Sequence, residues 1–337
     1  MNVLICTPVF HPSVGGLETI NVLLAQELVR YGWKVVLVTP IICDAKDSYP
    51  FQVVRCPGRK RLLELYKWCD VFVHNAIVLK YVYPALLFRK PFVVVHHSCT
   101  YNWNSKVNYQ SIAKRLISLI AHNITVSEAV AKNLKLPSDY TVINNFYDSN
   151  LFRINNRHSR AGFVYVGRLS YEKGVSLLLK AYSRYLQKGG NMSLTIVGGG
   201  YQQKELEQLA VDLNIDSRVY FAGIKRGVEL RDLLNEKRTL VLPSICNEAF
   251  GIVVLEAMAC GCYCIGSDGD GIQEAMGNIG HLFKKADADS LATAMLESEF
   301  DSDEKFLDYC VRVENHLQAF TLKNITERWI AFLERLV

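Results

Sequence analysis

Short apolar segments alternate with amphipathic helical segments along most of the 337-residue chain. Residues 3–7 are typical of a buried strand, and residues 17–31 place their apolar side chains at helical spacing before Gly32. Strands that alternate with helices fold into a mostly parallel sheet with helices on both faces. Further strands are expected at residues 34–39, 53–56, 71–74, 92–96, 123–126 and 141–143.

The pattern is interrupted by the polar residues 148–161 and then begins again. We therefore predict an α/β protein with two Rossmann-like, doubly wound domains facing a central cleft, where the carboxyl ends of parallel strands bind ligands. The predicted domains are residues 1–152 and 153–318, and a C-terminal helix within 319–337 is expected to pack back on the first domain. The second series has strands at 162–166, 193–197, 219–221, 239–242 and 263–266, and helices at 175–187, 290–297 and 324–336.

Composition favours a globular, intracellular protein. Half of the residues are hydrophobic and 21% are charged. The first residues lack the basic and apolar regions of a signal peptide, and the apolar runs are too short or too interrupted for a membrane span. Ten cysteines in such a chain favour free thiols in a reducing compartment. We therefore expect a cytoplasmic protein.

Charge is distributed unevenly between the two halves. Residues 1–150 carry 16 Lys and Arg against 9 Asp and Glu, whereas the remainder carries 22 against 24. A basic first half indicates an anionic partner, either a phosphate-bearing molecule or a membrane surface. A basic surface that only aids solubility is the alternative.

Two motifs raise the question of a bound metal. Cys260, Cys262 and Cys264 are closely spaced, but no second Cys/His pair follows at zinc-like spacing, so we interpret them as buried structural thiols. Asp268 and Asp270 have a spacing that suits a divalent metal, although they lie in a glycine-rich loop late in the second half. We favour a protein without metal or cofactor.

Two other motifs suit a phosphate group. Gly15 and Gly16 follow the first strand and open a helix, so they form either an anion site or a purely structural turn. Arg168 and Lys173 flank a turn after the first strand of the second half, where they either clamp a diphosphate or stand in a solvated loop. The chain has no P-loop motif, and the glycine run at 198–200 lacks a complete dinucleotide fingerprint. These absences disfavour a P-loop hydrolase and a nicotinamide dehydrogenase.

A pair of carboxylates surrounds the start of a predicted helix. Glu248 is expected just before this helix and Glu256 inside it, while Phe250, Gly251 and Ile252 contribute backbone amides at its N-terminus. Carboxylates accept hydrogen bonds from hydroxyl groups, and such amides donate to phosphate. A sugar nucleotide offers both kinds of group.

His96 ends an apolar strand, where it either faces a ligand or is structural. Taken together, these motifs resemble the retaining GT-B glycosyltransferases, specifically glycosyltransferase family 4. The family often has His-Asp where this chain has His96 and His97, and Asn-Gly where it has Asn144 and Asn145. The motifs that carry the resemblance are the Gly15–Gly16 turn, His96 and residues 125–128, 142–145, 167–174 and 248–261.

The resemblance implies an acceptor domain followed by a donor domain, and it implies a role for each candidate residue. Arg168 and Lys173 would neutralise the donor diphosphate without a metal as the leaving group develops charge. Glu248 would bind hydroxyls of the transferred sugar and Glu256 those of the ribose. His96 would approach the sugar, and donor contacts through backbone groups would come from Gly15, Gly16, Phe250, Gly251 and Ile252.

The predicted function is retaining hexosyl transfer from a nucleotide-diphosphate sugar, with a UDP-sugar favoured over GDP-mannose. The acceptor would be a glycan or lipid-linked molecule of cell-envelope polysaccharide synthesis, such as lipopolysaccharide, and no nucleic-acid partner is expected. A sugar-nucleotide epimerase or hydrolase, or a non-catalytic binding protein, are the alternatives. Peripheral attachment to the inner face of the cytoplasmic membrane would use basic residues that include Arg55, Arg59, Lys60, Arg61 and Lys67.

Overall fold

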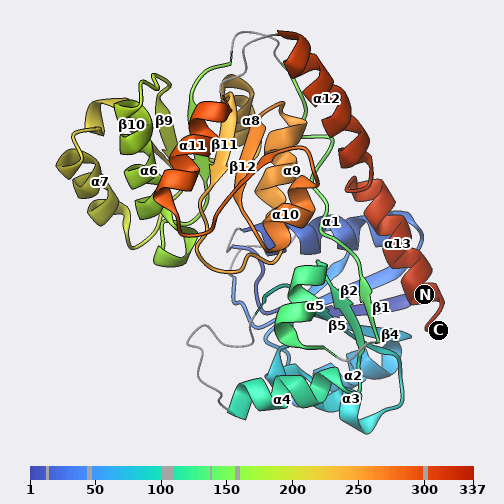
Figure 1. Cartoon of the computed structure of the whole chain (residues 1–337). Coiled ribbons are helices and arrows are strands. Elements are labelled where there is room, and N and C mark those ends of the chain that lie inside the picture. Colours follow the sequence, from blue (N-terminus) through green and yellow to red (C-terminus); the bar gives the residue numbers. More distant parts are fainter. Residues whose placement is uncertain (13–14, 44–47, 100–108, 137–138, 156–159, 299–302) are drawn as a thin grey trace. The chain divides into compact units, whose positions relative to one another are not determined.

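The chain forms two compact units (Figure 1). The computed structural model describes residues 1–12, 15–43, 48–99, 109–136, 139–155, 160–298 and 303–337. Unit 1 comprises Met1–Phe146 and Leu322–Val337, and unit 2 comprises Tyr147–Thr321. These divisions lie a few residues from the positions 152 and 318 predicted from the sequence. Part of the predicted linker, residues 156–159, lies outside the described residues.

Unit 1 is built on a seven-stranded, all-parallel sheet with the strand order β3-β2-β1-β4-β5-β6-β7. The chain begins at the centre, builds one side of the sheet and then returns to build the other, so the order reverses between β1 and β4. The strands are β1 Asn2–Cys6, β2 Lys34–Thr39, β3 Gln52–Arg55, β4 Val71–Asn75, β5 Phe92–His96, β6 His122–Thr125 and β7 Tyr140–Val142.

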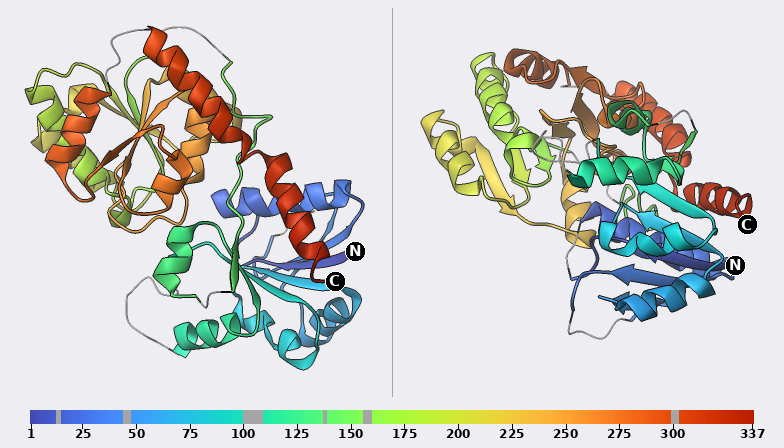
Figure 2. Two further views of the ribbon diagram at one scale, coloured as in Figure 1. Left: turned by 45° about the vertical axis from the view of Figure 1, so that its right-hand side comes forward. Right: turned by 90° about the horizontal axis from the view of Figure 1, so that it is seen from below.

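Helices cover both faces of this sheet (Figure 2). On one face, α2, η1, α3 and α4 enclose a core that includes Leu4, Phe72 and Val94. On the other face lies α1, which buries Ile20 and Leu24 and contacts the C-terminal α13. The helical elements are α1 Gly16–Arg30, α2 Arg59–Trp68, the 3₁₀ turn η1 Leu79–Tyr81, α3 Tyr83–Leu87, α4 Tyr109–Ser118, α5 Glu128–Leu134 and α13 Leu322–Glu334.

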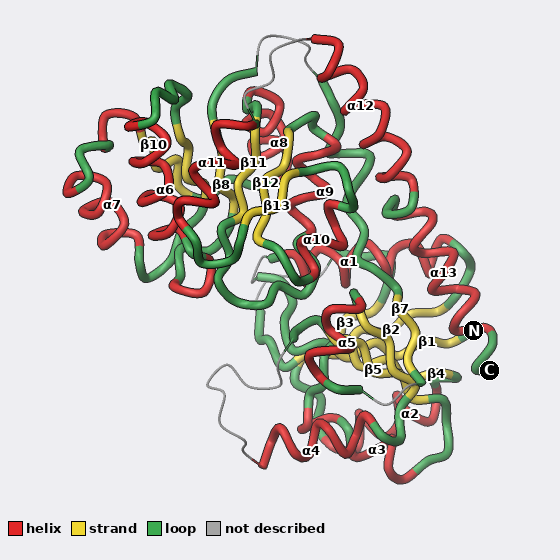
Figure 3. The backbone as a smooth tube through the Cα atoms, viewed as in Figure 1, coloured by secondary structure: helices red, strands yellow, loops and turns green. Residues whose placement is uncertain are grey.

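Unit 2 repeats the design with six parallel strands in the order β10-β9-β8-β11-β12-β13 (Figure 3). Its order reverses between β8 and β11, which pair directly. Both units are therefore Rossmann-like, as the sequence predicts. The strands are β8 Phe163–Val166, β9 Leu194–Val197, β10 Val219–Gly223, β11 Thr239–Leu242, β12 Tyr263–Ser267 and β13 His281–Phe283.

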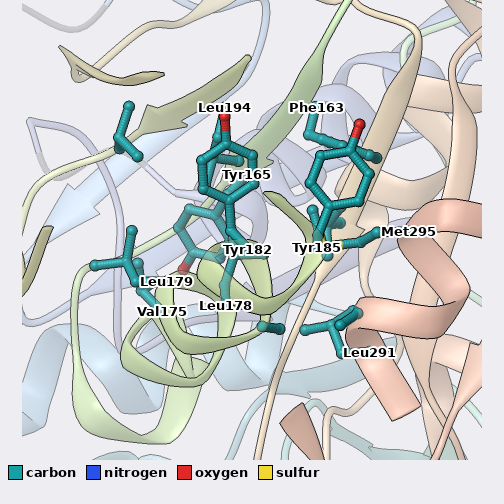
Figure 4. Close-up of a cluster of buried hydrophobic side chains, with 14 of the residues drawn as sticks. Phe163, Tyr165, Val175, Leu178, Leu179, Tyr182, Tyr185, Leu194, Leu291 and Met295 are labelled. Carbon is teal, nitrogen blue, oxygen red and sulfur yellow. The ribbon is translucent and has the colours of Figure 1, made fainter. Parts of the chain in front are cut away.

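A hydrophobic core of unit 2 lies between its sheet and the helices α6 and α11 (Figure 4). Phe163 and Tyr165 of β8 meet Tyr182 and Tyr185 of α6, and the Phe163 and Tyr185 rings pack edge to face with centroids 5.1 Å apart. This packing fixes the position of β8 and of the loop that follows it. The helical elements are η2 Tyr171–Lys173, α6 Val175–Gln187, α7 Gln203–Asp212, η3 Asp216–Arg218, α8 Gly227–Glu236, α9 Ile252–Ala259, α10 Gly271–Met276, α11 Ala288–Glu297 and α12 Asp303–Gln318.

Candidate functional site

The reversal of strand order in unit 2 defines where a ligand is expected. Adjacent parallel strands whose connections run in opposite directions leave a crevice at their carboxyl ends. The loops that follow β8 and β11 border this position. The β8–α6 loop carries Arg168 and Lys173, and the β11–α9 loop carries Glu248. The fold thus places three residues, predicted from two separate motifs, around one switch point.

Lys173 and Glu248 form an ion pair. Lys173 Nζ lies 2.5 Å from Glu248 Oε1, and Ser244 Oγ donates a hydrogen bond of 2.6 Å to the same oxygen. The Lys173 and Glu248 side chains are 22% and 16% exposed, so the pair is only partly solvated. We call these three residues the Lys173–Glu248–Ser244 cluster. Limited solvation strengthens the attraction between the two charges relative to a pair in bulk water.

The two loops of the cluster are held together by their backbones. Gly174 has a φ of 69°, and a Cβ atom at this position would lie 2.0 Å from the carbonyl oxygen of Pro243. The amides of Ile245 and Cys246 donate to the carbonyl oxygen of Glu172 over 3.1 and 3.3 Å. Because only glycine allows so close an approach, Gly174 fixes Lys173 beside the β11–α9 loop.

The main chain of Glu248 is anchored to the segment after β12. Its amide donates to Asp270 Oδ2 over 3.3 Å, and its carbonyl oxygen accepts from the amide of Gly271 over 3.1 Å. Lys285 Nζ donates to the same Asp270 oxygen over 2.7 Å. Burial raises the pKa of the Asp270 carboxyl, and the contact with Lys285 opposes this effect. Both the backbone and the side chain of Glu248 are therefore held in place.

The two aspartates that were considered as metal ligands, Asp268 and Asp270, have hydrogen-bonding roles in this segment. Asp270 caps α10, and Asp268 Oδ1 accepts from the backbone amide of Lys285 over 2.9 Å. Cys260, Cys262 and Cys264 are buried thiols, and burial raises the pKa of Cys260 and of Cys262 to about 12. Within the described ranges, no three His, Cys, Asp or Glu residues are grouped as potential metal ligands.

Arg168 differs from Lys173 in its surroundings. Its side chain is 63% exposed, and its guanidinium lies 3.8 Å from Glu172. Its carbonyl oxygen accepts a hydrogen bond of 2.8 Å from the hydroxyl of Tyr165, which ties the loop to the core. The backbone of Arg168 is therefore fixed, while the charged group extends into solvent at the rim of the switch point.

The N-terminus of α9 follows directly after the cluster. Gly251 is the N-cap residue with a φ of 88°, and as a glycine it has no side chain of its own to bond the first amides of the helix. Phe250 is 1% exposed and packs against Phe320, so its ring belongs to the core and only its amide suits a ligand. The helix starts at Ile252, which places Glu248 before it and Glu256 inside it, as predicted.

Glu256 lies in a different environment from Glu248. Its side chain is half-buried one turn into α9, and burial together with the nearby Asp148 raises the pKa of Glu256 to about 7. Near neutral pH its carboxyl group therefore populates both the protonated and the charged form. Both forms accept hydrogen bonds from hydroxyl groups, and the protonated form also donates one.

In unit 1, the predicted glycine turn opens α1 as expected. Gly15 is the N-cap residue in an extended conformation, and α1 begins at Gly16. The buried Glu18 lies against this turn, because its Oε2 is 2.8 Å from the place of a Cβ on Gly15. A protein carboxylate thus already occupies the helix N-terminus. A contact of these glycines with a diphosphate stays a prediction.

His96 ends β5 and is 4% exposed. Its Nε2 atom lies 2.9 Å from Asn123 Oδ1 of β6, and burial lowers the pKa of the imidazole. Its ring is thus held by a buried hydrogen bond within the sheet. A contact of His96 with the sugar stays a prediction.

A second set of polar side chains lies at the carboxyl edge of this sheet, and it was not predicted from the sequence. Asn21 Nδ2 donates to Thr7 Oγ1 over 3.0 Å, Asn75 Nδ2 donates to Asn21 Oδ1, and a ring nitrogen of His97 pairs with Asn75 Oδ1. We call Thr7, Asn21, Asn75 and His97 the switch-point network, since β1 and β4 meet there. Burial and the neighbouring His96 lower the pKa of His97 to about 3. The sequence held a signal for this network, because the polar Thr7 directly follows the apolar β1 and the polar Asn75 ends β4.

A cavity of about 720 Å³ lies at the opposite edge of the unit 2 sheet. It is bordered by segments that precede β8, β9 and β10, including Gly162, Ser193 and Arg218. The Lys173–Glu248–Ser244 cluster therefore lies outside this cavity.

Solved structures share the fold of this chain. A glycosyltransferase from Rickettsia africae superimposes with a TM-score of 0.83 at 15% identity, covering 99% of this chain and 98% of the other. The Anabaena protein Alr3699/HepE in complex with UDP and glucose gives a TM-score of 0.83 at 20% identity, with full coverage of both chains. The two Rossmann-like domains are those of the GT-B fold.

The family follows from two adjoining sequence matches. Residues 14–151 match the model described as Glycosyltransferase Family 4, and residues 148–310 match the model described as Glycosyl transferases group 1. Together the two matches span residues 14–310. The chain belongs to the glycosyltransferases that these two models describe, as the sequence motifs indicated.

The alignments with two curated relatives cover different shares of this chain. The gpi3 subunit of the Schizosaccharomyces pombe phosphatidylinositol N-acetylglucosaminyltransferase is 28% identical, with the alignment covering 90% of this chain and 73% of that protein. An uncharacterized glycosyltransferase of Methanocaldococcus jannaschii is 38% identical, but the match covers 33% of this chain and 28% of the archaeal protein. In the described parts of the chain, no helix is both long enough and apolar enough to cross a membrane.

Proposed function

We propose that the protein is a retaining glycosyltransferase that moves a hexosyl group from a nucleotide-diphosphate sugar to a glycan or lipid-linked acceptor. The Lys173–Glu248–Ser244 cluster carries this proposal. It combines a cation, a carboxylate and a hydroxyl at the switch point of a Rossmann-like sheet, directly before the N-terminus of α9, whose cap residue is a glycine. A diphosphate joined to a sugar requires this combination of charge and hydrogen-bonding groups.

In the proposed reaction, Lys173 and Arg168 stabilise the negative charge that develops on the leaving diphosphate. Glu248 accepts hydrogen bonds from hydroxyls of the transferred sugar, and Glu256 does so from the ribose. The bond between the anomeric carbon and the phosphate oxygen breaks, and its electron pair leaves with the nucleoside diphosphate. The acceptor oxygen bonds to the same face of the anomeric carbon, and its proton passes to the leaving phosphate. Configuration is thereby retained without an enzymic nucleophile.

Charge neutralisation by side chains rather than by a divalent metal is part of the proposal. Lys173 stands at the switch point and Arg168 at its rim. The carboxylates that had the spacing of metal ligands, Asp268 and Asp270, accept hydrogen bonds from Lys285 instead. Activity in the presence of a metal chelator is the expected result.

A UDP-sugar is the favoured donor, and GDP-mannose is the second. The Anabaena protein of the same fold has been solved with UDP-glucose. A lipid-linked acceptor is supported by the fission yeast relative, whose name specifies phosphatidylinositol. The proposed role is in cell-envelope polysaccharide synthesis by a cytoplasmic, peripheral membrane enzyme.

A thermal-shift screen with UDP-glucose, UDP-galactose, UDP-N-acetylglucosamine and GDP-mannose tests the donor. A ligand at about 100 times its dissociation constant stabilises the folded state by about 2.7 kcal/mol, which gives a measurable rise in Tm. No rise with any nucleotide sugar would contradict the donor assignment.

Turnover separates the proposed activity from its alternatives. Release of the nucleoside diphosphate should require an added acceptor, whereas release without acceptor would indicate a hydrolase. Glu248→Gln should lose transfer while keeping a thermal shift with the donor. Equal activity of this variant and the parent would contradict the role of Glu248, and no turnover with any acceptor would favour a binding protein.

A further inference from the structure

The first unit exposes apolar side chains on two short helices. Leu86 and Leu87 end α3, Ile112 and Leu116 lie on α4, and Leu119 and Ile120 follow it. Each of these six residues is between 52% and 66% exposed. We call them the α3–α4 patch. Single exposed apolar residues are common on protein surfaces, but several on adjoining elements indicate an interaction site.

The two helices belong to one layer of unit 1 (Figure 1). α4 contacts η1, the turn that leads into α3, and α3 contacts α2. Ile117 of α4 is buried in the same core as Leu62 and Leu65 of α2. α4 therefore buries one side against the sheet and leaves Ile112 and Leu116 on a side that faces solvent.

The charged residues in the segment that carries the patch have one sign. Between Asp70 and Glu128 the sequence contains no acidic residue, yet it contains six Lys and Arg residues. Of these, Arg89 follows α3 and Arg115 lies on α4, and both are exposed. An apolar surface on a segment whose only charges are positive is complementary to a layer of anionic headgroups above hydrocarbon.

We propose that the α3–α4 patch inserts into the interface of an anionic lipid bilayer, where it holds the protein beside a lipid-linked acceptor. The patch supplies the apolar contact and the surrounding basic residues supply the electrostatic attraction, the two signals that stable peripheral binding requires. A symmetric dimer through this face would place Arg89 and Arg115 against a second set of the same charges. The charge therefore favours a membrane over a second copy of the chain.

The proposal also relates the apolar residues to the basic helix α2. Arg59 begins α2, and its carbonyl oxygen accepts a hydrogen bond of 2.9 Å from the hydroxyl of Tyr83 in α3. The basic start of α2 is therefore next to α3. Arg55, by contrast, donates to the carbonyl oxygens of His11 and Ile41 and joins loops within unit 1. Membrane contact is thus assigned to α2, α3 and α4 rather than to the basic first half as a whole.

Vesicle co-sedimentation with the full-length chain tests this inference. Vesicles of phosphatidylcholine with about one third phosphatidylglycerol should bind the protein, and pure phosphatidylcholine should bind it less because the electrostatic attraction is absent. Ile112→Ser/Leu116→Ser should reduce partitioning onto the anionic vesicles about tenfold or more, because two apolar anchors are lost. Leu307→Ser/Val311→Ser is the matched control, since these residues have the same spacing on α12 and are 65% and 59% exposed. The control should bind as the parent does.

Three results would overturn the inference. The first is no binding of the parent to anionic vesicles, and the second is equal binding by the parent and Ile112→Ser/Leu116→Ser. The third is a concentration-dependent dimer in sedimentation velocity that this variant abolishes, since a second copy would then cover the patch. The inference rests on the proposed lipid-linked acceptor. Donor thermal shifts measured without vesicles distinguish its failure from failure of the glycosyltransferase assignment.

Discussion

Replacing Glu256 by Gln is expected to stabilise unit 2 at high pH and to have little effect at low pH. Burial and Asp148 raise the pKa of Glu256 from 4.5 to about 7 in the folded chain. Between pH 4.5 and about pH 7 the folded chain binds more protons than the unfolded chain. The free energy of unfolding therefore falls as the pH rises through this range. Above pH 7 the charged carboxylate imposes its full cost. Glutamine never carries this charge and has a similar helix propensity.

The size of the effect follows from the two pKa values. A difference of about 2.5 in pKa corresponds to about 3 kcal/mol at 1.36 kcal/mol for each pH unit. This is an upper figure, because Glu256 is half-buried and solvent screens part of the repulsion from Asp148. Urea denaturation at pH 8 should therefore show the Gln variant to be more stable by as much as about 3 kcal/mol. At pH 4.5 the gain should be well below 1 kcal/mol.

Two further variants test the cause. Asp148→Asn should recover part of the same gain at pH 8, and the double variant with Glu256→Gln should gain less than the sum of the two. Glu207→Gln, on the exposed side of α7, should change stability little at either pH. Equal stabilisation by Glu256→Gln at pH 4.5 and pH 8, or none at pH 8, would refute the reasoning. If Glu256 also binds the ribose, its Gln variant should show a smaller donor thermal shift despite its greater stability.

Three other variants probe the Lys173–Glu248–Ser244 cluster. Lys173→Met removes the cation beside Glu248, so it should abolish transfer and lower the free energy of unfolding by about 1–3 kcal/mol; wild-type activity would contradict the charge role. Gly174→Ala should cost at least about 3 kcal/mol in urea denaturation, whereas Gly189→Ala, at a positive φ with nothing within 4 Å, should cost about 1 kcal/mol; equal costs would show that the loop contact is unimportant. Asp270→Asn keeps a good helix cap but weakens the anchor of Glu248, so kcat should fall about tenfold with little change in Tm; an unchanged kcat would remove Asp270 from this role.

Much of the fold could be predicted because its strands are buried on both faces. Such strands are continuous apolar runs bounded by turns, as at residues 92–96 and 239–242, and a parallel sheet with crossover helices follows from their alternation. β13 was missed because His281–Phe283 has only three residues and follows the glycine-containing segment 277–280. Its partner β12 supplies the hydrogen bonds that make this short segment a strand.

The candidate site was predictable in its members but less so in its contacts. Arg168, Lys173 and Glu248 could be placed near one edge, because the carboxyl ends of parallel strands meet there. The pairing of Lys173 with Glu248 depends on how two loops pack, and no local pattern encodes that distance. The contact of His97 with Asn75 likewise joins the residue after β5 to the end of β4.

The ends of unit 2 meet each other. Tyr147 forms a β-bridge with Thr321, and its amide donates to the carbonyl oxygen of Phe320 over 3.3 Å. Unit 2 is therefore an insertion of about 175 residues into the chain of unit 1. Closing a flexible loop of that length costs on the order of 4–5 kcal/mol. If unit 2 folds first, it closes this loop before unit 1 is complete, and α13 then reaches α1 as a nearby segment rather than from the far end of the chain.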